Sequence, residues 1–225
     1  IPLGRCFHLA VTLDGVLADG SKGDAHIYVN GVEVATGSIQ APRSGVVRSA
    51  CWIGKSNWSA DPLFRGQMSE VRIFSAPRTT SQIAAAYAAP LAGSESGLCR
   101  LYRLDTPSST QAIDASPAAA HGSIVSTVST QVTGGRSGLA FNGTTDYVAL
   151  LPLATDLSLG FTISAWVYFN RNDPWARIVD LGNGPASDNI ILCRYSSTQL
   201  NFSVYNGASL GELITPTGVL PIDGT

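Results

Sequence analysis

Alternation of apolar and polar residues dominates this chain and predicts β-strands. Between residues 161 and 169 every second residue is apolar, and residues 200–205 alternate in the same way. Because successive side chains of a strand point to opposite faces, this period gives each strand one apolar face. The pattern therefore predicts a chain built mainly of half-buried strands.

Asn-Gly pairs mark turns between these strands. Asn30-Gly31 separates two runs rich in β-forming residues, at 26–29 and 32–35, and the same pair recurs at 142–143 and 206–207. An Asn-Gly pair favours a two-residue hairpin because both positions accept a positive φ. Strands and turns at this spacing predict an antiparallel two-sheet sandwich.

One short helix is expected in the otherwise all-β chain. Thr79 and Gln82 have the spacing of a capping box, in which each side chain accepts a hydrogen bond from the other residue's backbone N–H. Residues 83–89 are rich in Ala, and Pro90 ends the helix. The small residues that follow, at 91–97, predict a linker.

Composition narrows the possible partners. Charged residues make up 13% of the 225 residues, and the formal net charge is −2. Nucleic-acid binding needs clustered Lys and Arg, and a membrane-surface helix needs a basic face, but the sequence has neither. No stretch approaches the roughly 18 apolar residues of a membrane-spanning helix. We therefore expect no nucleic acid and no membrane insertion, and the length suits one large sandwich or two small domains.

Four widely spaced cysteines favour two disulfides over a metal site, because the sequence has no Cys-x-x-Cys pair and no Cys/His cluster. They are Cys6, Cys51, Cys99 and Cys193. Of the three possible pairings we favour Cys6–Cys51 together with Cys99–Cys193. Four buried free thiols in a reducing compartment are the alternative.

Three Asn-x-Ser/Thr sequons, at Asn57, Asn142 and Asn201, are candidate N-glycosylation sites. Asn142 lies in a predicted turn, where a glycan is tolerated. Together with the cysteines and the low charge, the sequons favour an extracellular or cell-surface protein.

Several segments carry motifs that occur together in one known family. Residues 4–15 (GRCFHLAVTLDG) resemble its W-x-H-V-A-x-T-x-D-G strand, with Cys6 in place of the Trp, and residues 161–167 are FTISAWV. Further segments are YVNG at 28–31, WIG at 52–54, FRGQMSEVRIF at 64–74 and LAFNGTTDYV at 139–148. The chain thus resembles the laminin G-like, concanavalin A-like lectin and glucanase family. This resemblance implies an all-β, antiparallel two-sheet jelly-roll sandwich with one short helix.

The motifs occur in circularly permuted order. Residues 1–92 resemble the second half of a laminin G-like sandwich, and residues 93–225 resemble the first half. Joining Thr225 to Ile1 would restore the family's order. The chain is either a circular permutant that closes into one domain, or one period of a tandem array whose halves belong to neighbouring sandwiches. The start without Met and the end in mid-pattern favour the array.

The resemblance also suggests a calcium ion. Members of the family often bind calcium near the start of the domain, through an early Asp and a residue of the last strand. Asp114 and Glu70 resemble these ligands, but Pro117 replaces the usual Gly and Ser69 the usual Asp. Because calcium needs about six to eight oxygen ligands, each lost carboxylate weakens the site.

The acidic residues do not favour an enzyme. Glycan hydrolysis needs two carboxylates about 5–9 Å apart. The glutamates are Glu33, Glu70, Glu95 and Glu212, and none has an acidic residue two or three positions away on its strand. His8, His26 and His121 share no spacing that indicates a metal or acid–base pair. We expect no catalytic residue.

Exposed aromatic residues beside polar ones are the candidate ligand site, because sugars stack on rings and hydrogen-bond to carboxylates and amides. Trp58 and Trp175 are expected in loops, beside Asp61 and Asp173. Tyr195 and Tyr205 are further candidates, whereas Trp52 and Trp166 have the pattern of packing residues. Structural packing of all four tryptophans is the alternative.

The sequence is compatible with two functions. The first is a non-enzymatic extracellular structural or assembly module, a unit of a repetitive surface or filament protein that contacts neighbouring copies or repeats. The alternative is a carbohydrate- or ligand-binding module of an adhesin-like surface protein.

Overall fold

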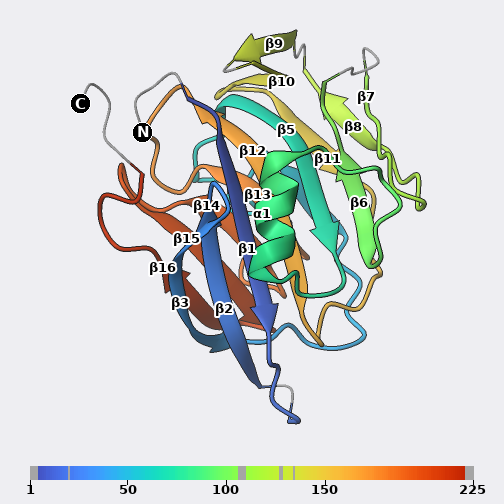
Figure 1. Ribbon diagram of the computed structural model, residues 1–225, viewed down its shortest axis with the longest axis vertical. Helices are drawn as coiled ribbons and strands as arrows, with labels where there is room; N and C mark the ends of the chain where they lie inside the picture. Colours follow the sequence, from blue (N-terminus) through green and yellow to red (C-terminus); the bar gives the residue numbers. More distant parts are fainter. Residues whose placement is uncertain (1–4, 20, 106–109, 127–128, 134, 221–225) are drawn as a thin grey trace.

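The chain forms two antiparallel sheets that pack face to face, with one short helix (Figure 1). The structure is a computed structural model and describes residues 5–19, 21–105, 110–126, 129–133 and 135–220. The predicted jelly-roll sandwich with one helix is confirmed.

The first sheet has the order β3-β2-β1-β12-β5-β10-β9, and β6 also pairs with β5. Its strands are β1 (Phe7–Asp14), β2 (Lys22–Val29), β3 (Val32–Gln40), β5 (Arg65–Phe74), β6 (Leu98–Tyr102), β9 (Ser129–Thr133), β10 (Arg136–Asn142) and β12 (Phe161–Phe169). The second sheet has the order β16-β15-β14-β13-β4-β11-β8-β7. Its strands are β4 (Ala50–Ile53), β7 (Gln111–Ala112), β8 (Gly122–Val125), β11 (Tyr147–Leu150), β13 (Arg177–Gly182), β14 (Ile190–Arg194), β15 (Leu200–Asn206) and β16 (Ser209–Ile214).

Alternating apolar side chains fill the space between the sheets. In β12 the inner face carries Phe161, Ile163 and further apolar residues that are completely buried. Phe161 meets Phe202 of the second sheet edge-on, with ring centroids 5.8 Å apart. Full burial of one such side chain contributes about 1.5–3 kcal/mol, so these inward faces hold the sheets together.

Each sheet contains strands from both halves of the sequence. In the first sheet β12 lies between β1 and β5, and in the second sheet β4 lies between β13 and β11. Residues 1–92 and 93–225 therefore share both sheets and one core. The central strands of each segment find their partners within this chain.

Helix α1 (Thr80–Ala88) lies across the outer face of the first sheet (Figure 1). The predicted capping box is present: Thr79 Oγ1 accepts from the N–H of Gln82, and Gln82 Oε1 accepts from the N–H of Thr79. Buried Ile83 packs with Ala10 of β1 and Tyr28 of β2. The helix therefore buries polar and apolar outer-face residues that a sandwich strand usually exposes.

The predicted linker at residues 91–97 is part of the sandwich. Leu91 packs against Phe74, Leu98 and Leu101, and the Glu95 carboxylate accepts from the backbone N–H groups of Ala92 and Gly93. This segment joins α1 to β6 without separating two domains.

The predicted disulfides are wrong, because all four cysteines are free. In each predicted pair, one cysteine lies in the second sheet (Cys51 in β4, Cys193 in β14) and the other does not, because Cys6 precedes β1 and Cys99 lies in β6 of the first sheet. The thiols of Cys6, Cys51 and Cys99 donate to the carbonyls of Thr133, Arg48 and Gly97, and that of Cys193 contacts Asn201 Oδ1. Burial raises the pKa of Cys51 to about 11 and that of Cys193 to about 12, so both stay protonated near neutral pH. The four cysteines are widely spaced in the sequence because each packs at a different place in the fold.

Candidate ligand-binding surface

Arg177, the first residue of β13, joins two loops over the second sheet. Its guanidinium carbon lies 5.4 Å from the ring centre of Trp58 and 5.7 Å from that of Trp175. Nη1 donates to the carbonyl of Trp175 at 2.8 Å, and Nη2 donates to Asp61 Oδ2 at 2.8 Å. The β4–β5 loop and the β12–β13 loop are thus fixed to the same side chain.

Two tyrosines extend this arrangement. The ring centroids of Tyr205, in β15, and Trp58 are 5.6 Å apart. Those of Tyr195, just after β14, and Trp175 are 5.0 Å apart, in an edge-to-face contact. We call Trp58, Trp175, Tyr195, Tyr205 and Arg177 the aromatic cluster. The structure therefore brings together residues that the sequence marked separately.

Trp175 is held in a conformation that is unusual for a bulky residue. Its φ is 65°, in the left-handed region, and its backbone N–H donates to the carbonyl of Arg194 at 2.7 Å. Its side chain remains 40% exposed. Left-handed backbone at a non-Gly residue costs on the order of 1–3 kcal/mol and is concentrated at functional sites. The strained backbone presents a large ring to solvent, which packing alone does not require.

Hydrogen bonds fix the loop that carries Trp58. The Trp58 N–H donates to Ser56 Oγ at 3.0 Å, and Ser56 Oγ donates to Asp61 Oδ2 at 2.7 Å. Because Asp61 Oδ2 also accepts from Arg177, the loop and the strand share one carboxylate oxygen. The position of the Trp58 ring is set by this network.

A second, buried carboxylate lies beside Arg177. Asp180 is fully buried, and its oxygens accept from the backbone N–H and the side-chain amide of Asn57 and from the side chain of Asn189. Burial raises the pKa of Asp180, while these hydrogen bonds and Arg177 act in the opposite direction. Arg177 Nε lies 3.8 Å from Asp180 Oδ2, so the guanidinium has a carboxylate on each side, Asp61 and Asp180.

Asp173 takes a different place from the one expected. It shares the β12–β13 loop with Trp175, but its carboxylate forms an ion pair with Arg171, and its backbone carbonyl accepts from the N–H of Ala176. Three of the four predicted binding residues, Trp58, Trp175 and Asp61, therefore meet at Arg177, and Asp173 supports the loop.

The other two tryptophans have packing roles. Trp52 Nε1 donates to Asn57 Oδ1 at 3.1 Å, and its ring meets Tyr147 edge-on. Trp166, 7% exposed, stacks on Tyr87 of α1 beneath the Arg136 guanidinium. Trp166 lies on the first sheet, away from the aromatic cluster.

Asp114 and Glu70 do not fit a calcium site. Asp114 Oδ1 accepts from the N–H groups of Leu101 and Ser116, and its Oδ2 accepts from that of Ala120. Glu70 forms ion pairs with two arginines, at positions 72 and 136. Neither carboxylate is directed at a shared point with the six to eight oxygens that calcium needs. Within the described ranges no three His, Cys, Asp or Glu side chains are grouped to hold a metal. Calcium binding at this pair stays a prediction that the donor geometry does not favour.

The side chains of two of the three sequon asparagines are held inside the fold. The Asn57 side chain donates to the Ala50 carbonyl and to Asp180, and Asn201 is fully buried. Because a glycan is bulky and needs an exposed amide, the fold does not favour glycosylation at these two positions, where it stays a prediction. Asn142 is exposed at its turn, and glycosylation there stays a prediction.

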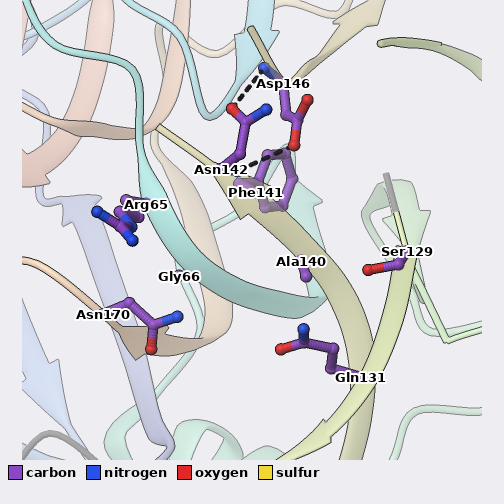
Figure 2. A pocket seen from close by; sticks show the side chains of 9 residues that line it. All are labelled: Arg65, Gly66, Ser129, Gln131, Ala140, Phe141, Asn142, Asp146 and Asn170. Atoms are coloured by element: carbon purple, nitrogen blue, oxygen red, sulfur yellow. Dashed lines mark hydrogen bonds between the residues drawn. The ribbon is translucent and has the colours of Figure 1, made fainter. Parts of the chain in front are cut away.

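A cavity of about 290 Å³ lies on the first sheet, between β5, β10 and β9 (Figure 2). Its lining is mostly polar: Arg65, Gly66, Ser129, Gln131, Ala140, Phe141, Asn142, Asp146 and Asn170. Its single aromatic lining residue, Phe141, is 3% exposed. No ring in its lining is free to stack on a ligand, so the aromatic cluster is the better candidate site.

Arg177 is the functional candidate that sequence reasoning missed. The strand RIVDLG holds two charged residues among apolar ones, and both are buried on the outer face of the second sheet. The signal available in the sequence was two charged residues in an otherwise apolar strand that directly follows the Trp175 loop.

Comparison with known proteins identifies one family. A family model described as the concanavalin A-like lectin/glucanases superfamily matches residues 1–84 and 142–224, which is more than half of the chain. No curated protein and no solved structure gave a significant match. In the part of the chain that the structure describes, no helix has the length and apolar character needed to span a membrane.

Proposed function

The chain belongs to the concanavalin A-like lectin/glucanase superfamily, a lectin-like or binding fold, and we propose that it binds carbohydrate at the aromatic cluster. The observation that carries this proposal is the convergence of Trp58, Trp175, Tyr195 and Tyr205 around the Arg177–Asp61 pair. Rings supply apolar faces for the C–H groups of a sugar, and Asp61 supplies a hydrogen-bond acceptor for its hydroxyls.

The charge balance of the surface favours neutral sugars over acidic ones. Arg177 is matched by Asp61 and lies 3.8 Å from Asp180, and Arg171 is paired with Asp173. A cation that already has a carboxylate partner offers little to a uronate or sulfate group, because binding would have to break the existing pair. We propose neutral oligosaccharides as the ligand class.

The same contacts support a binding module without catalysis. A glycosidase needs an accessible acid and a second carboxylate about 5–9 Å away. Here Asp180 is enclosed by its hydrogen bonds, Glu70 is paired with arginine, and Glu212 accepts from Asn201. Glu33 forms an ion pair with His26, and Glu95 accepts from two backbone N–H groups. Each of these groups has a structural partner.

An extracellular location fits this function. Laminin G-like domains are typically extracellular. The buried thiols of Cys51 and Cys193 are compatible with an oxidising compartment, because burial and a raised pKa both suppress the thiolate that reacts with oxidants.

Glycan-array binding, followed by calorimetry on each hit, tests the proposal. We expect a neutral oligosaccharide to bind the wild-type chain and Trp175→Ala to lower its affinity at least about tenfold, equivalent to about 1.4 kcal/mol. Tyr87→Ala is the matched control, because it removes a ring of similar exposure (38%) from α1 on the other sheet. Thermal melts establish that each variant is folded. The proposal would be contradicted if the wild-type chain bound no glycan on the array, or if Trp175→Ala bound as tightly as the wild-type chain.

A structural or assembly role, in which copies or repeats of this chain build a surface filament, is the second candidate. The observation that favours it is an open strand at one edge of the first sheet, β9.

A further inference from the structure

We propose that two copies of this chain associate by antiparallel pairing of their β9 strands, which joins their first sheets into one. The inference deepens the assembly role and rests on it. It is independent of the carbohydrate site, which lies on the second sheet.

In the described part of the chain, the sheet edges other than β9 are covered or very short. The first sheet ends at β3 and β9 and has β6 as a further edge beside β5, and the second sheet ends at β16 and β7. The other side of β6 is covered, because the Ala115 N–H donates to the Leu101 carbonyl and Tyr102 forms a β-bridge with Asp114. On one side of the sandwich β3 and β16 pack together so closely that a Cβ added at Gly211 would lie 2.3 Å from the backbone nitrogen of Gln40. On the other side β7 has only two residues. Among the described strands, β9 has five residues, pairs only with β10 and leaves its other edge without a partner strand.

The sequence of β9 lacks the features that protect an open edge. Its residues, Ser129-Thr130-Gln131-Val132-Thr133, include no charge and no proline, and they pair with β10 without a bulge. Val132 is 75% exposed. Proteins usually protect an open edge with Lys, Pro or a bulge, because its unpaired N–H and C=O groups accept another strand. An unprotected edge therefore indicates a partner strand.

The residues of β9 are exposed, apart from Thr133, which is half-buried. Figure 2 shows the side chains of Ser129 and Gln131 turned toward the cavity on the outer face of the sheet. Every second residue of an edge strand directs its N–H and C=O away from the sheet, so a row of hydrogen-bonding groups remains available.

A side chain from β5 fixes this edge before any partner binds. Gln67 Nε2 donates to the carbonyls of Gln131, at 2.9 Å, and Arg136, at 3.0 Å, and so ties both strands of the β9–β10 hairpin to β5. Gly138 of β10 leaves the room for this contact, because a Cβ there would lie 2.9 Å from Gln67 Nε2. A preorganised strand loses less conformational entropy on pairing.

A second copy is the partner that the chemistry of β9 fits. Antiparallel pairing of a strand with itself is isologous, so one edge serves both molecules. Two uncharged strands approach without like-charge repulsion, and Thr and Val form favourable cross-strand pairs. Five residues form a short ladder, so the dimer is weak and depends on concentration.

Sedimentation velocity over a range of concentrations tests the pairing on the full 225-residue chain. We expect the wild-type chain to shift from monomer to dimer as its concentration rises. Val132→Lys, which places a charge on the open edge, should remain monomeric. Val32→Lys is the matched control, because Val32 is 65% exposed on β3, at the closed side. It should dimerise as the wild-type chain does.

Amide hydrogen exchange gives a second readout at the strand itself. In the dimer, the amides of residues 129–133 should exchange more slowly at high than at low concentration, and Val132→Lys should abolish that difference. A wild-type chain that stays monomeric at every concentration, or a Val132→Lys variant that dimerises normally, would overturn the pairing. Val132→Lys should keep its affinity for carbohydrate, so failure of the pairing and failure of the binding proposal give different results.

Discussion

At the scale of single residues, one buried arginine organises the proposed binding surface. Arg177 is 5% exposed and contacts both tryptophan rings, Asp61 and the backbone of Trp175. Removing one partner of a buried ion pair leaves an uncompensated charge, which costs about 3–5 kcal/mol. The arginine therefore stabilises the fold and also sets the spacing of the rings.

A buried histidine gives this fold a pH dependence. His8 Nε2 lies 3.3 Å from Arg72 Nη1, which donates to it, so the imidazole is neutral. Burial, together with the positive charges of Arg72 and Arg136, lowers the pKa of His8 to about 3. An unfolded His titrates near 6.5, so below that pH the unfolded chain holds more protons and folding loses about 1.4 kcal/mol per pH unit. Above pH 6.5 His8 does not lower the unfolding free energy, and the loss grows as the pH falls from 6.5 toward 3.

Urea denaturation between pH 7 and 5, above the usual range of carboxylate titration, measures this effect. We expect the unfolding free energy of the wild-type chain to fall below pH 6.5 by about 1.4 kcal/mol per unit more than that of His8→Gln, whose amide accepts from Arg72 at every pH. Parallel pH profiles for the two proteins would contradict a neutral, buried His8.

Part of the site could be predicted at the residue scale. Trp58, Trp175 and Asp61 stood out because aromatic residues in polar loops are unusual in a sandwich. Arg177 did not, because a charged residue at the start of a strand normally faces solvent. The free cysteines were misassigned, and the burial of Asn201 could not be foreseen, because disulfide and sequon rules depend on spacing and local sequence, whereas burial depends on tertiary contacts.

At the scale of elements, the β9–β10 hairpin depends on a glycine. A Cβ at Gly138 would lie 2.5 Å from the Met68 carbonyl and 2.9 Å from Gln67 Nε2. Since Gln67 is the side chain that ties β9 to β5, the hairpin and its anchor occupy the same narrow space.

Gly138→Ala should therefore loosen this hairpin. We expect a loss of about 1–3 kcal/mol in unfolding free energy, in the range of an overpacked site, and faster amide exchange in residues 129–142. Gly45→Ala is a control for the general effect of losing a glycine, because a Cβ at Gly45 meets no atom within 4 Å, although its φ of 71° adds its own strain. Unchanged exchange in the hairpin of Gly138→Ala would show that the close approach is not maintained in solution.

The strands and the capped helix were predictable because their signals are local. The alternation in β12, the Asn30-Gly31 turn and the Thr79–Gln82 box act over a few residues, and the structure contains all three. The edge character of β9 could not be read from the sequence, because it depends on which strands lie beside it. The same reason explains the mistaken linker at 91–97, whose Leu91 packs on residues of β5 and β6.

At the scale of the whole molecule, the two halves of the sequence form one sandwich. Ile163 of β12, in the second segment, is fully buried and pairs with Val11 of β1 and Ile73 of β5, both in the first segment. We propose that the chain is a circularly permuted domain that folds as one unit, rather than two halves completed by neighbouring repeats.

The Ile163→Ala variant tests whether the chain folds as one unit. Removing the side chain leaves a cavity between strands of both segments and should lower the unfolding free energy by about 2–5 kcal/mol. We expect one transition that moves as a whole, with far-UV circular dichroism and tryptophan fluorescence in agreement. Two separate transitions, of which the variant shifts only one, would support independent half-domains and the tandem array.

The most direct test of carbohydrate binding at the aromatic cluster is the NMR spectrum of the four tryptophan indole N–H groups during titration with a neutral oligosaccharide. We expect the signals of Trp58 and Trp175 to shift and saturate together, while that of Trp166, beneath α1 on the first sheet, stays in place. Binding that leaves Trp58 and Trp175 unmoved, or moves Trp166 alone, would place the ligand elsewhere and contradict the proposed site.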